Sequence, residues 1–198
     1  LLQHTSHTAP YLIFCYTKDM ESEHIVLLSP TGIPIGSAPK LASHHHDTPL
    51  HLAFSCYVFN DSGKLLVTQR ALSKKVWPGV WTNSFCGHPF PDEKLEDAVI
   101  RRAHDELGTR IKCIECVVKD YQYTMPAYEN VIENEICPVF FAQIDGLIHP
   151  NPDEVEAYRW LSWDEYAMEL VDRAQDYSYW AKDVFRLLPP DHPFRVHS

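Results

Sequence analysis

The stretch GHPFPDEKLEDAVIRRAHDELG, residues 87–108, decides the fold because it joins a helical apolar pattern to a distinctive spacing of charged residues. Its apolar residues share one helical face and are Leu95, Ala98, Val99, Ala103 and Leu107. We predict a helix from about Asp92 to Leu107, with Asp92 as its N-cap and Gly108 as its C-terminal stop.

The same stretch has the spacing G-x5-E-x7-R, at Gly87, Glu93 and Arg101. This spacing resembles the Nudix box, a loop–helix–loop whose helix presents carboxylates to magnesium and a diphosphate. The match is degenerate, because Arg102 stands where the box usually has a glutamate and Asp105 replaces one of its paired glutamates. A Nudix hydrolase needs those carboxylates to activate water, so the resemblance implies the fold more strongly than the hydrolase activity.

Strands are predicted on both sides of this helix. Residues 23–28, EHIVLL, indicate a first strand that ends at the turn residues SPTGIP. Residues 50–58 alternate between two faces, and NDSG then turns the chain into KLLVTQR, which predicts a hairpin ending at Arg70. Residues 131–144, VIENEICPVFFAQI, predict a strand that Pro138 places at a sheet edge or interrupts with a bulge.

A further helix is predicted over residues 162–175, SWDEYAMELVDRAQ. Strands in the middle of the chain with helices around them indicate an α+β fold, and we expect a Nudix-like α/β/α sandwich around a mixed β-sheet. The chain of 198 residues is long enough for one sizeable core, so we expect a single domain over residues 23–198. Residues 1–22 are interpreted as an N-terminal extension, either disordered or foreign to the natural sequence, because Met20 resembles a natural start.

The composition is that of a globular protein and excludes several partners. Hydrophobic residues make up 45% and charged residues 22%, and no apolar stretch is long enough for a membrane span. The formal net charge of -10 argues against binding to nucleic acid or anionic lipid, so a bound anion needs a local basic cluster. The six cysteines are spread along the chain, which favours reduced thiols and a cytoplasmic location. Cys113 and Cys116 form a CxxC that we interpret as structural, with a zinc half-site as the alternative.

The segment NSFCGHPF, residues 83–90, places Cys86 and His88 two residues apart with Gly87 between them. From the residues alone, this pair is a metal half-site, an acid/base pair or two unrelated side chains in a tight turn. We interpret Gly87 as the source of a tight backbone that aims the two side chains differently.

Carboxylates, imidazoles and cations form further candidate groups. Glu133 and Glu135 point to one face of a predicted strand, which suits two ligands of one cation, although a solvated edge strand also fits. His51 lies in a predicted strand, and imidazole with carboxylate suits zinc, manganese or iron. Basic residues that could hold a diphosphate are Arg70, Lys74, Lys75 and Arg102.

Longer segments extend the resemblance from one box to a family. TPLHLAFSCYVF, LLVTQRALSKKVWPGVWTNSFCGHP, ENEICPVF and DEVEAYRWLSWDE resemble, in this order, segments of the bacterial type I isopentenyl diphosphate isomerases. The chain is similar to these enzymes over roughly residues 23–185. The resemblance implies an isomerase of isoprenoid biosynthesis that interconverts isopentenyl and dimethylallyl diphosphate by a 1,3-allylic proton shift.

The resemblance also implies roles for particular residues. Cys86 resembles the catalytic thiol and Glu135 the opposing acid/base carboxylate, with Tyr123 and Trp180 as aromatic active-site residues. The implied ligands of one manganese or zinc ion are His44, His51, His88, Glu133 and Glu135. Glu106 is implied in binding magnesium at the diphosphate, and the implied diphosphate contacts are Lys40, Arg70, Lys74 and Arg102. One departure is YSYW, residues 177–180, because many relatives have a proline before the tryptophan.

The implied chemistry agrees with these residue types. Protonating an unactivated alkene develops tertiary-carbocation character, which a tryptophan face can stabilise. Removing the allylic proton then needs a second group across the substrate. No flavin is implied. The expected partner is the small-molecule substrate, with no nucleic acid and no membrane, and the protein is expected to be a monomer or a weak homodimer.

Two other classes of function remain open from the residues. A Nudix diphosphate hydrolase would release phosphate from nucleoside diphosphate derivatives. A non-catalytic metal-binding module would bind metal without isomerisation and would depend on Cys113 or Cys116 rather than on His51 or Glu133.

Overall fold

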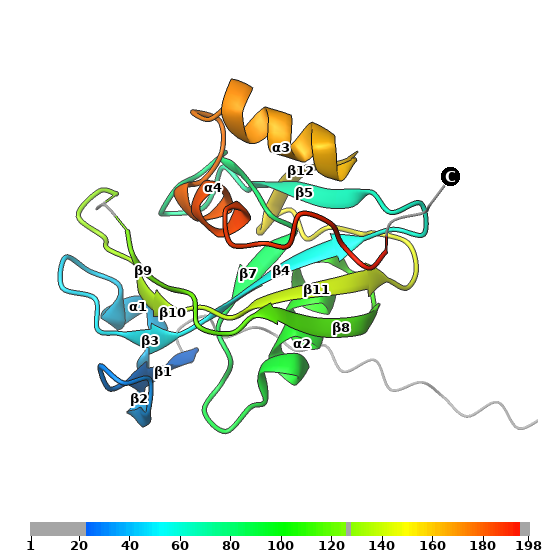
Figure 1. Cartoon of the computed structure of the whole chain (residues 1–198). Coiled ribbons are helices and arrows are strands. Elements are labelled where there is room, and N and C mark those ends of the chain that lie inside the picture. Colours follow the sequence, from blue (N-terminus) through cyan, green and yellow to red (C-terminus); the bar gives the residue numbers. More distant parts are fainter. Residues whose placement is uncertain (1–22, 126–127, 195–198) are drawn as a thin grey trace, which may run out of the picture.

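The computed structural model describes residues 23–125 and 128–194, so the expected extension, residues 1–22, lies outside the described residues. Within that part of the chain the strands form two sheets, with the smaller one at one end of the molecule (Figure 1). The order of the smaller sheet is β2 (Pro34–Pro39), β1 (His24–Leu28), β3 (His51–Leu52), β10 (Asn134–Ile136) and β9 (Gln122–Thr124).

The larger sheet forms the centre of the molecule. Its main order is β12 (Val155–Leu161), β5 (Leu65–Arg70), β4 (Phe54–Phe59), β11 (Val139–Ile144) and β8 (Ile111–Val118). Two short strands join it, with β6 (Trp81–Thr82) on β5 and β7 (Phe85–Gly87) on β4. The helices are α1 (Lys40–Ser43), α2 (Leu95–Leu107), α3 (Trp163–Asp172) and α4 (Tyr179–Phe185).

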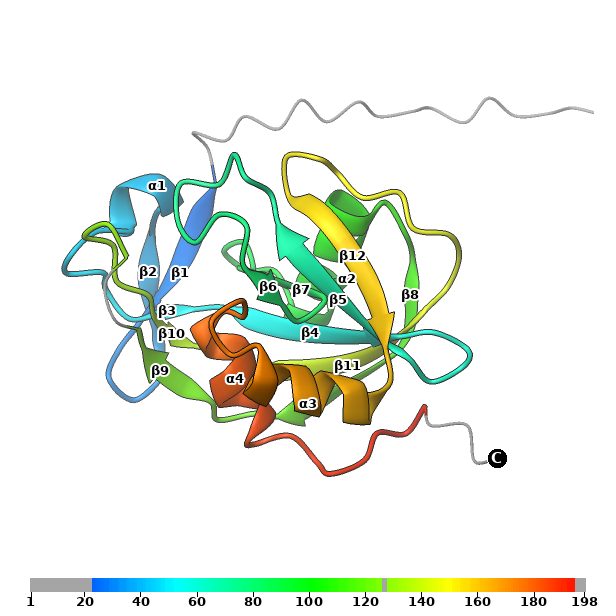
Figure 2. The ribbon, with the colours of Figure 1, turned by 90° about the horizontal axis from the view of Figure 1, so that it is seen from above.

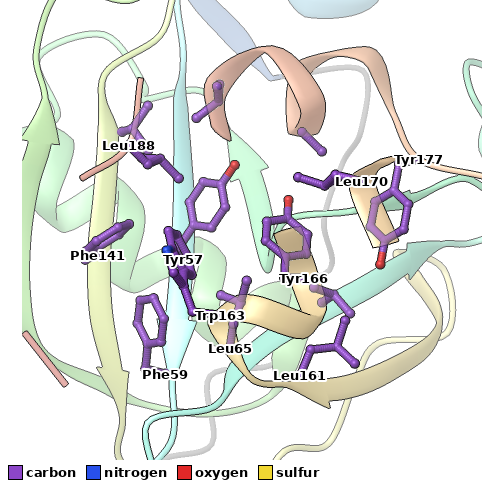
Figure 3. Close-up of a cluster of buried hydrophobic side chains, with 14 of the residues drawn as sticks. Tyr57, Phe59, Leu65, Phe141, Leu161, Trp163, Tyr166, Leu170, Tyr177 and Leu188 are labelled. Atoms are coloured by element: carbon purple, nitrogen blue, oxygen red, sulfur yellow. The ribbon is translucent and has the colours of Figure 1, made fainter. Parts of the chain in front are cut away.

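Helices cover both faces of the larger sheet, which confirms the predicted α/β/α sandwich and α+β class. Figure 1 shows α2 below the sheet and α3 with α4 above it, and these two helices lie nearest to the viewer in Figure 2. The apolar stripe of α2 packs on Phe54, Cys56 and Val58 of β4. The opposite face of β4 carries Tyr57 and Phe59, which pack with residues of α3 and α4 in the cluster of Figure 3.

The predicted strand over residues 131–144 is divided at Pro138 into two strands that belong to different sheets. Strand β10 pairs in parallel with β3, and β11 pairs in parallel with β4. Each also has an antiparallel neighbour, so neither β10 nor β11 is an edge strand. The predicted interruption at Pro138 is therefore confirmed, and the register of β11 with β8 shifts just after it, between Val139 and Phe140, whereas the alternative of an edge strand is wrong. A proline, which donates no backbone hydrogen bond, lies where the chain crosses from one sheet to the other.

The ends of the helices differ in how well the sequence predicted them. Helix α2 begins at Leu95 after Lys94, and Asp92 has a φ of 65° instead of capping the helix. Gly108 ends α2 in the left-handed conformation, as expected, and a Cβ there would lie 2.3 Å from the His149 carbonyl oxygen. Ser162 forms a capping box at the start of α3. Among the described residues, no helix combines the length and apolar character needed to cross a membrane.

Candidate active site

Five predicted metal ligands converge where the two sheets meet. His51 lies on β3, Glu135 on its parallel neighbour β10, and Glu133 directly before β10. His44 follows α1, and His88 follows β7. In each of two sets of side chains, the possible ligand atoms lie within 4.8 Å of one another. The sets are His44–His51–His88 and His51–Glu133–Glu135.

Hydrogen bonds to the backbone orient two of the imidazoles. His44 Nδ1 donates to the Lys40 carbonyl oxygen at 2.7 Å, and His51 Nδ1 donates to the Pro49 carbonyl oxygen at 2.9 Å. Because a carbonyl oxygen only accepts, each proton lies on Nδ1 and each Nε2 lone pair is left for a ligand. The two Nε2 atoms are directed toward the carboxylates, with His44 Nε2 3.4 Å from Glu133 and His51 Nε2 3.4 Å from Glu135.

The third imidazole completes the same arrangement. His88 Nε2 lies 3.2 Å from His51 Nε2 and 3.2 Å from Glu135 Oε1. Burial lowers the pKa of His88 to about 3, so this imidazole is neutral near pH 7. Burial alone would raise the pKa of Glu135, but its contacts with His51 and His88 hold the pKa well below the usual range. The neutral imidazole of His88 beside the ionised carboxylate of Glu135 offers donors of the kind that a divalent metal binds.

Within the described part of the chain, two buried polar atoms of this cluster have no hydrogen-bond partner, namely His88 Nδ1 and Glu133 Oε2. Buried polar atoms of native proteins are nearly always satisfied, so exceptions point to an additional group. Mixed nitrogen and oxygen donors suit manganese, zinc or iron, and the residues present therefore fit a divalent metal. The Tyr123 hydroxyl, from β9, donates to Glu135 Oε2 on the side away from His88.

Cys86 lies beside the metal cluster but is held by different partners. Its Sγ donates to Asn83 Oδ1 at 3.3 Å and lies 3.3 Å from Ser55 Oγ. Among the described residues, Cys86 belongs to neither set of possible metal ligands. Burial raises the pKa of the Cys86 thiol to about 11, so the thiol keeps its proton at neutral pH. Asn83 is itself fixed, because its Nδ2 donates to the carbonyls of Cys56 and Phe85 at 2.9 and 2.7 Å.

Gly87 is required at this point for a reason that the sequence did not indicate. Gly87 is not among the glycines with a positive φ, so the expected tight backbone does not rest on a left-handed conformation. A Cβ at Gly87 would instead lie 2.8 Å from Arg102 Cγ and 3.0 Å from Phe54 Cζ. The glycine therefore lets α2 and β4 approach the backbone between Cys86 and His88.

Glu93 and Arg101, which match the box spacing, have a structural role here. Arg101 binds the Glu93 carboxylate through Nε and Nη2, both at 2.8 Å. Its Nη2 also donates to the His88 carbonyl oxygen at 3.0 Å. Helix α2 thus holds the backbone of a metal-ligand candidate, and Asp105 only borders the same arginine at 3.8 Å.

Three of the four predicted diphosphate contacts lie near one another and are paired with carboxylates. Arg102 Nη2 lies 2.6 Å from Glu106 Oε1. Lys74 binds Glu154, and Lys40 Nζ lies 3.0 Å from Glu23 Oε2. Burial lowers the pKa of Lys40 and raises the pKa of Glu106. A small cavity lined by Lys40, His88, Arg101 and Arg102 connects this group to the metal cluster.

Arg70 and Trp180 belong to a separate contact group. Arg70 donates to the carbonyls of Val76 and Trp77, and its guanidinium carbon lies 5.7 Å from the centre of the Trp180 ring. Trp180 also meets Trp77 edge-on, with 5.6 Å between ring centres. The Trp180 side chain is buried, and its Nε1 has no hydrogen-bond partner among the residues that the structure describes.

The remaining sequence candidates lie elsewhere. Cys113 is exposed and Cys116 partly buried on β8, and among the described residues neither belongs to a possible metal-ligand set. Sequence reasoning assigned no role to Ser55, Asn83 or Glu154. The signal for each was present, because all three lie inside the quoted motifs, but only the structure shows what they contact.

Comparisons with known proteins first identify the class of protein to which this chain belongs. The Nudix domain model matches residues 49–183. The DR0079 protein of Deinococcus radiodurans has a TM-score of 0.64 at 16% identity, over 84% of this chain and 99% of that one. A MutT protein of Methanosarcina mazei has a TM-score of 0.54 at 19% identity, over 70% and 92%. At these identities the structures show the fold alone, and together with the domain match they make this chain a Nudix protein.

Curated relatives narrow the family. The chain is 47% identical over 167 residues to the isopentenyl-diphosphate Delta-isomerase of Mycolicibacterium vanbaalenii, covering 84% of this chain and 92% of the relative. It is 52% identical over 141 residues to that of Shigella boydii, covering 71% and 78%. Within the Nudix proteins, the chain belongs to the isopentenyl-diphosphate Delta-isomerases.

Proposed function

We propose that this protein interconverts isopentenyl and dimethylallyl diphosphate in isoprenoid biosynthesis, by adding one proton to the alkene and removing one from the allylic carbon. The proposal is supported by the buried thiol of Cys86, whose pKa is raised by burial and by the charge of Glu135, and by the His and Glu side chains beside it that could hold a metal ion. The family membership of the chain supports the same reaction.

The metal cluster is proposed to hold one manganese or zinc ion through His44, His51, His88, Glu133 and Glu135. When bound, this ion polarises the Glu135 carboxyl group and makes it a stronger acid. Tyr123 donates its hydroxyl hydrogen bond to Glu135 and keeps the carboxylate in place during proton transfer. Elemental analysis of the purified protein distinguishes manganese from zinc.

Cys86 and Glu135 act as a complementary acid/base pair. One of them delivers a proton to the terminal alkene carbon, and the other removes a proton from the allylic carbon, so the double bond moves without net loss or gain of protons. The group that delivers the proton in one direction of the reaction removes it in the reverse direction. Asn83 and Ser55 contact Cys86 Sγ and hold the thiol in position, which is the contribution of orientation to such a step.

The carbocation character that develops between the two steps needs a stabilising surface. Trp180 is proposed to supply its ring face, an interaction worth about 2 kcal/mol when desolvated. The burial of Trp180 among Trp77 and Arg70 keeps water away from that face. Lys40, Arg70, Lys74 and Arg102 are proposed to hold the diphosphate, with magnesium at Glu106.

We propose that residues 23–198 act as one domain, in a monomer or weak homodimer located in the cytoplasm. The parallel strand pairs that run from one sheet into the other support the single domain, because they leave no boundary between the sheets. Its substrate is a small-molecule diphosphate.

The proposal is tested by incubating the purified, metal-loaded protein with isopentenyl diphosphate. We expect dimethylallyl diphosphate, detected by proton NMR as the loss of the terminal methylene signals, and exchange with solvent deuterium at the reacting carbons. A metal-loaded protein that forms no product would overturn the isomerase function. Phosphate release from nucleoside diphosphate derivatives in the same preparation would instead identify a hydrolase.

A further inference from the structure

Glu154 occupies the space between two of the cations proposed to bind the diphosphate. It lies directly before β12, and its side chain is 11% exposed. Its Oε2 accepts a hydrogen bond from Lys74 Nζ and lies 3.4 Å from Arg102 Nη2. No role in the reaction has been given to this carboxylate above.

The backbone holds Glu154 in this position. The Ala71 amide donates to the Glu154 carbonyl oxygen at 3.0 Å, and the Glu154 amide donates to the Asn151 carbonyl oxygen at 3.0 Å. Next to it, Val155 pairs with Arg70 at the ends of β12 and β5. The segment that carries Lys74 and the segment that carries Glu154 are therefore joined by main-chain hydrogen bonds, so their ion pair is a built feature of the site.

The charges of this group balance before any substrate is present. Arg102 binds Glu106 through Nε at 3.0 Å and Nη2 at 2.6 Å, and Lys74 binds Glu154, so two cations are matched by two carboxylates. The side chains of Arg102, Glu106 and Glu154 are each about nine-tenths buried. A diphosphate that approaches Lys74 and Arg102 also approaches the negative charge of Glu154, and like charges in a partly buried site repel strongly.

We propose that Glu154 is the resident counter-ion of the diphosphate site, so that a diphosphate binds well only together with a divalent cation. The proposal rests on the proposed diphosphate site. Before binding, Glu154 pairs with Lys74 and lies beside Arg102, so that Glu154 and Glu106 together neutralise the two cations. A bound divalent cation supplies the positive charge that Glu154 and Glu106 otherwise take from the two side chains, which frees both cations for the diphosphate.

This exchange of partners couples the binding of the two ligands. The diphosphate and the divalent cation each increase the affinity for the other by the same factor, because such coupling is reciprocal. A single residue, Glu154, accounts for much of the coupling, since it repels the diphosphate when no cation is present. If Glu154 only supported the loop, its loss would not strengthen metal-free binding of the diphosphate. It would weaken diphosphate binding both with and without the divalent cation.

The test measures the binding of inorganic pyrophosphate by titration calorimetry, with chelator and with saturating Mg²⁺. We expect Glu154→Gln to bind pyrophosphate about tenfold more tightly than the wild type without Mg²⁺, and the enhancement by Mg²⁺ to shrink by a similar factor. The matched control is Asp153→Asn, which removes the same charge from an exposed neighbour and should behave as the wild type. Glu154→Asp, which keeps the charge but withdraws it, should give an intermediate value.

The outcomes separate this inference from the proposed function. Equal or weaker metal-free binding by Glu154→Gln in a protein with native thermal unfolding would overturn the counter-ion role while leaving the isomerase assay untouched. If Glu154→Gln were too unstable to titrate, Glu154→Asp with unchanged metal-free affinity would overturn it in the same way. A wild type that binds no pyrophosphate even with Mg²⁺ would overturn both the inference and the diphosphate site on which it rests.

Discussion

Side chains two residues apart do different work at residues 83–90. Cys86 contacts Asn83 and Ser55, whereas His88 turns its Nε2 toward Glu135. Gly87 between them admits Arg102 and Phe54 at close range. Residues two apart on a regular strand share one face, so alternation alone would place both side chains together. Their partners differ because β7 ends at Gly87 and His88 lies beyond the strand.

Cys86→Ala tests this division of labour. We expect turnover of isopentenyl diphosphate to fall by at least about 10²-fold, the usual contribution of a positioned acid or base. Bound metal should stay at the wild-type level, because Sγ is not among the possible ligand atoms of the described residues. Steady-state kinetics and elemental analysis measure the two quantities. The control is Cys116→Ala on β8, and turnover near the wild-type value in Cys86→Ala would refute the catalytic thiol.

At the scale of elements, one ion-pair network fastens α3 to the larger sheet. Arg159 of β12 binds Glu169 of α3 through Nη1 and Nη2 at 3.0 and 2.8 Å, and Tyr177 donates to Glu169 at 2.7 Å. The Arg159 guanidinium also lies 4.0 Å from the centre of the Trp81 ring. The segment that leads to α4 and Trp180 is thereby held against β6.

Glu169→Gln should lower the free energy of unfolding by about 1 kcal/mol at pH 7, the value of a partly exposed, multiply bonded ion pair. Burial alone would raise the pKa of Glu169, but hydrogen bonds from Tyr177 and Arg159 outweigh it and leave the pKa below 4.5. A carboxylate with a lowered pKa stabilises the fold above its ordinary pKa and loses that contribution as the pH falls through the lowered value.

The difference in free energy of unfolding between the wild type and Glu169→Gln should therefore be largest at neutral pH and shrink below about pH 4.5. Urea unfolding across this range measures it. The control is Glu156→Gln, which removes the same charge from an exposed position of β12. A difference that is constant down to pH 3 would show that the ionised carboxylate is not the source of the stability.

At the scale of the whole molecule, the candidate metal joins segments that are far apart in the chain. Its ligands come from the segments around residues 44, 51, 88 and 133–135. They meet because β3–β4 and β10–β11 run in parallel from one sheet to the other, which brings Glu135 beside His51. A ligand that binds only this folded arrangement stabilises the entire fold.

Removing the metal should therefore lower the melting temperature. At a free metal concentration of about 100 times Kd the stabilisation is about 2.7 kcal/mol, which for a chain of this size corresponds to roughly 5 to 10 °C. Calorimetry with metal and with chelator measures the shift. His44→Asn should abolish the shift, whereas His46→Asn, an exposed histidine outside the ligand sets of the described residues, should retain it. An equal shift in both variants would exclude His44 as a ligand.

Much of this molecule is determined by local sequence. The stripe of α2, the hairpin ending at Arg70, the stop at Gly108 and the order of the family motifs depend on residues close in the chain, so alternation, turn chemistry and spacing predict them. The motifs also name the metal ligands and Cys86, because a family resemblance is a property of the sequence itself.

Only the tertiary structure decides which of these residues meet. The crossing at Pro138 depends on strand partners about 80 residues away. The sequence of one strand does not specify which strands pair with it. The same holds for the close approach at Gly87, for the contact of Ser55 with Cys86, and for Glu154, whose partners Lys74 and Arg102 lie far from it in sequence. Contacts between distant segments arise from packing the two sheets and α2 together, and their distances follow from that packing alone.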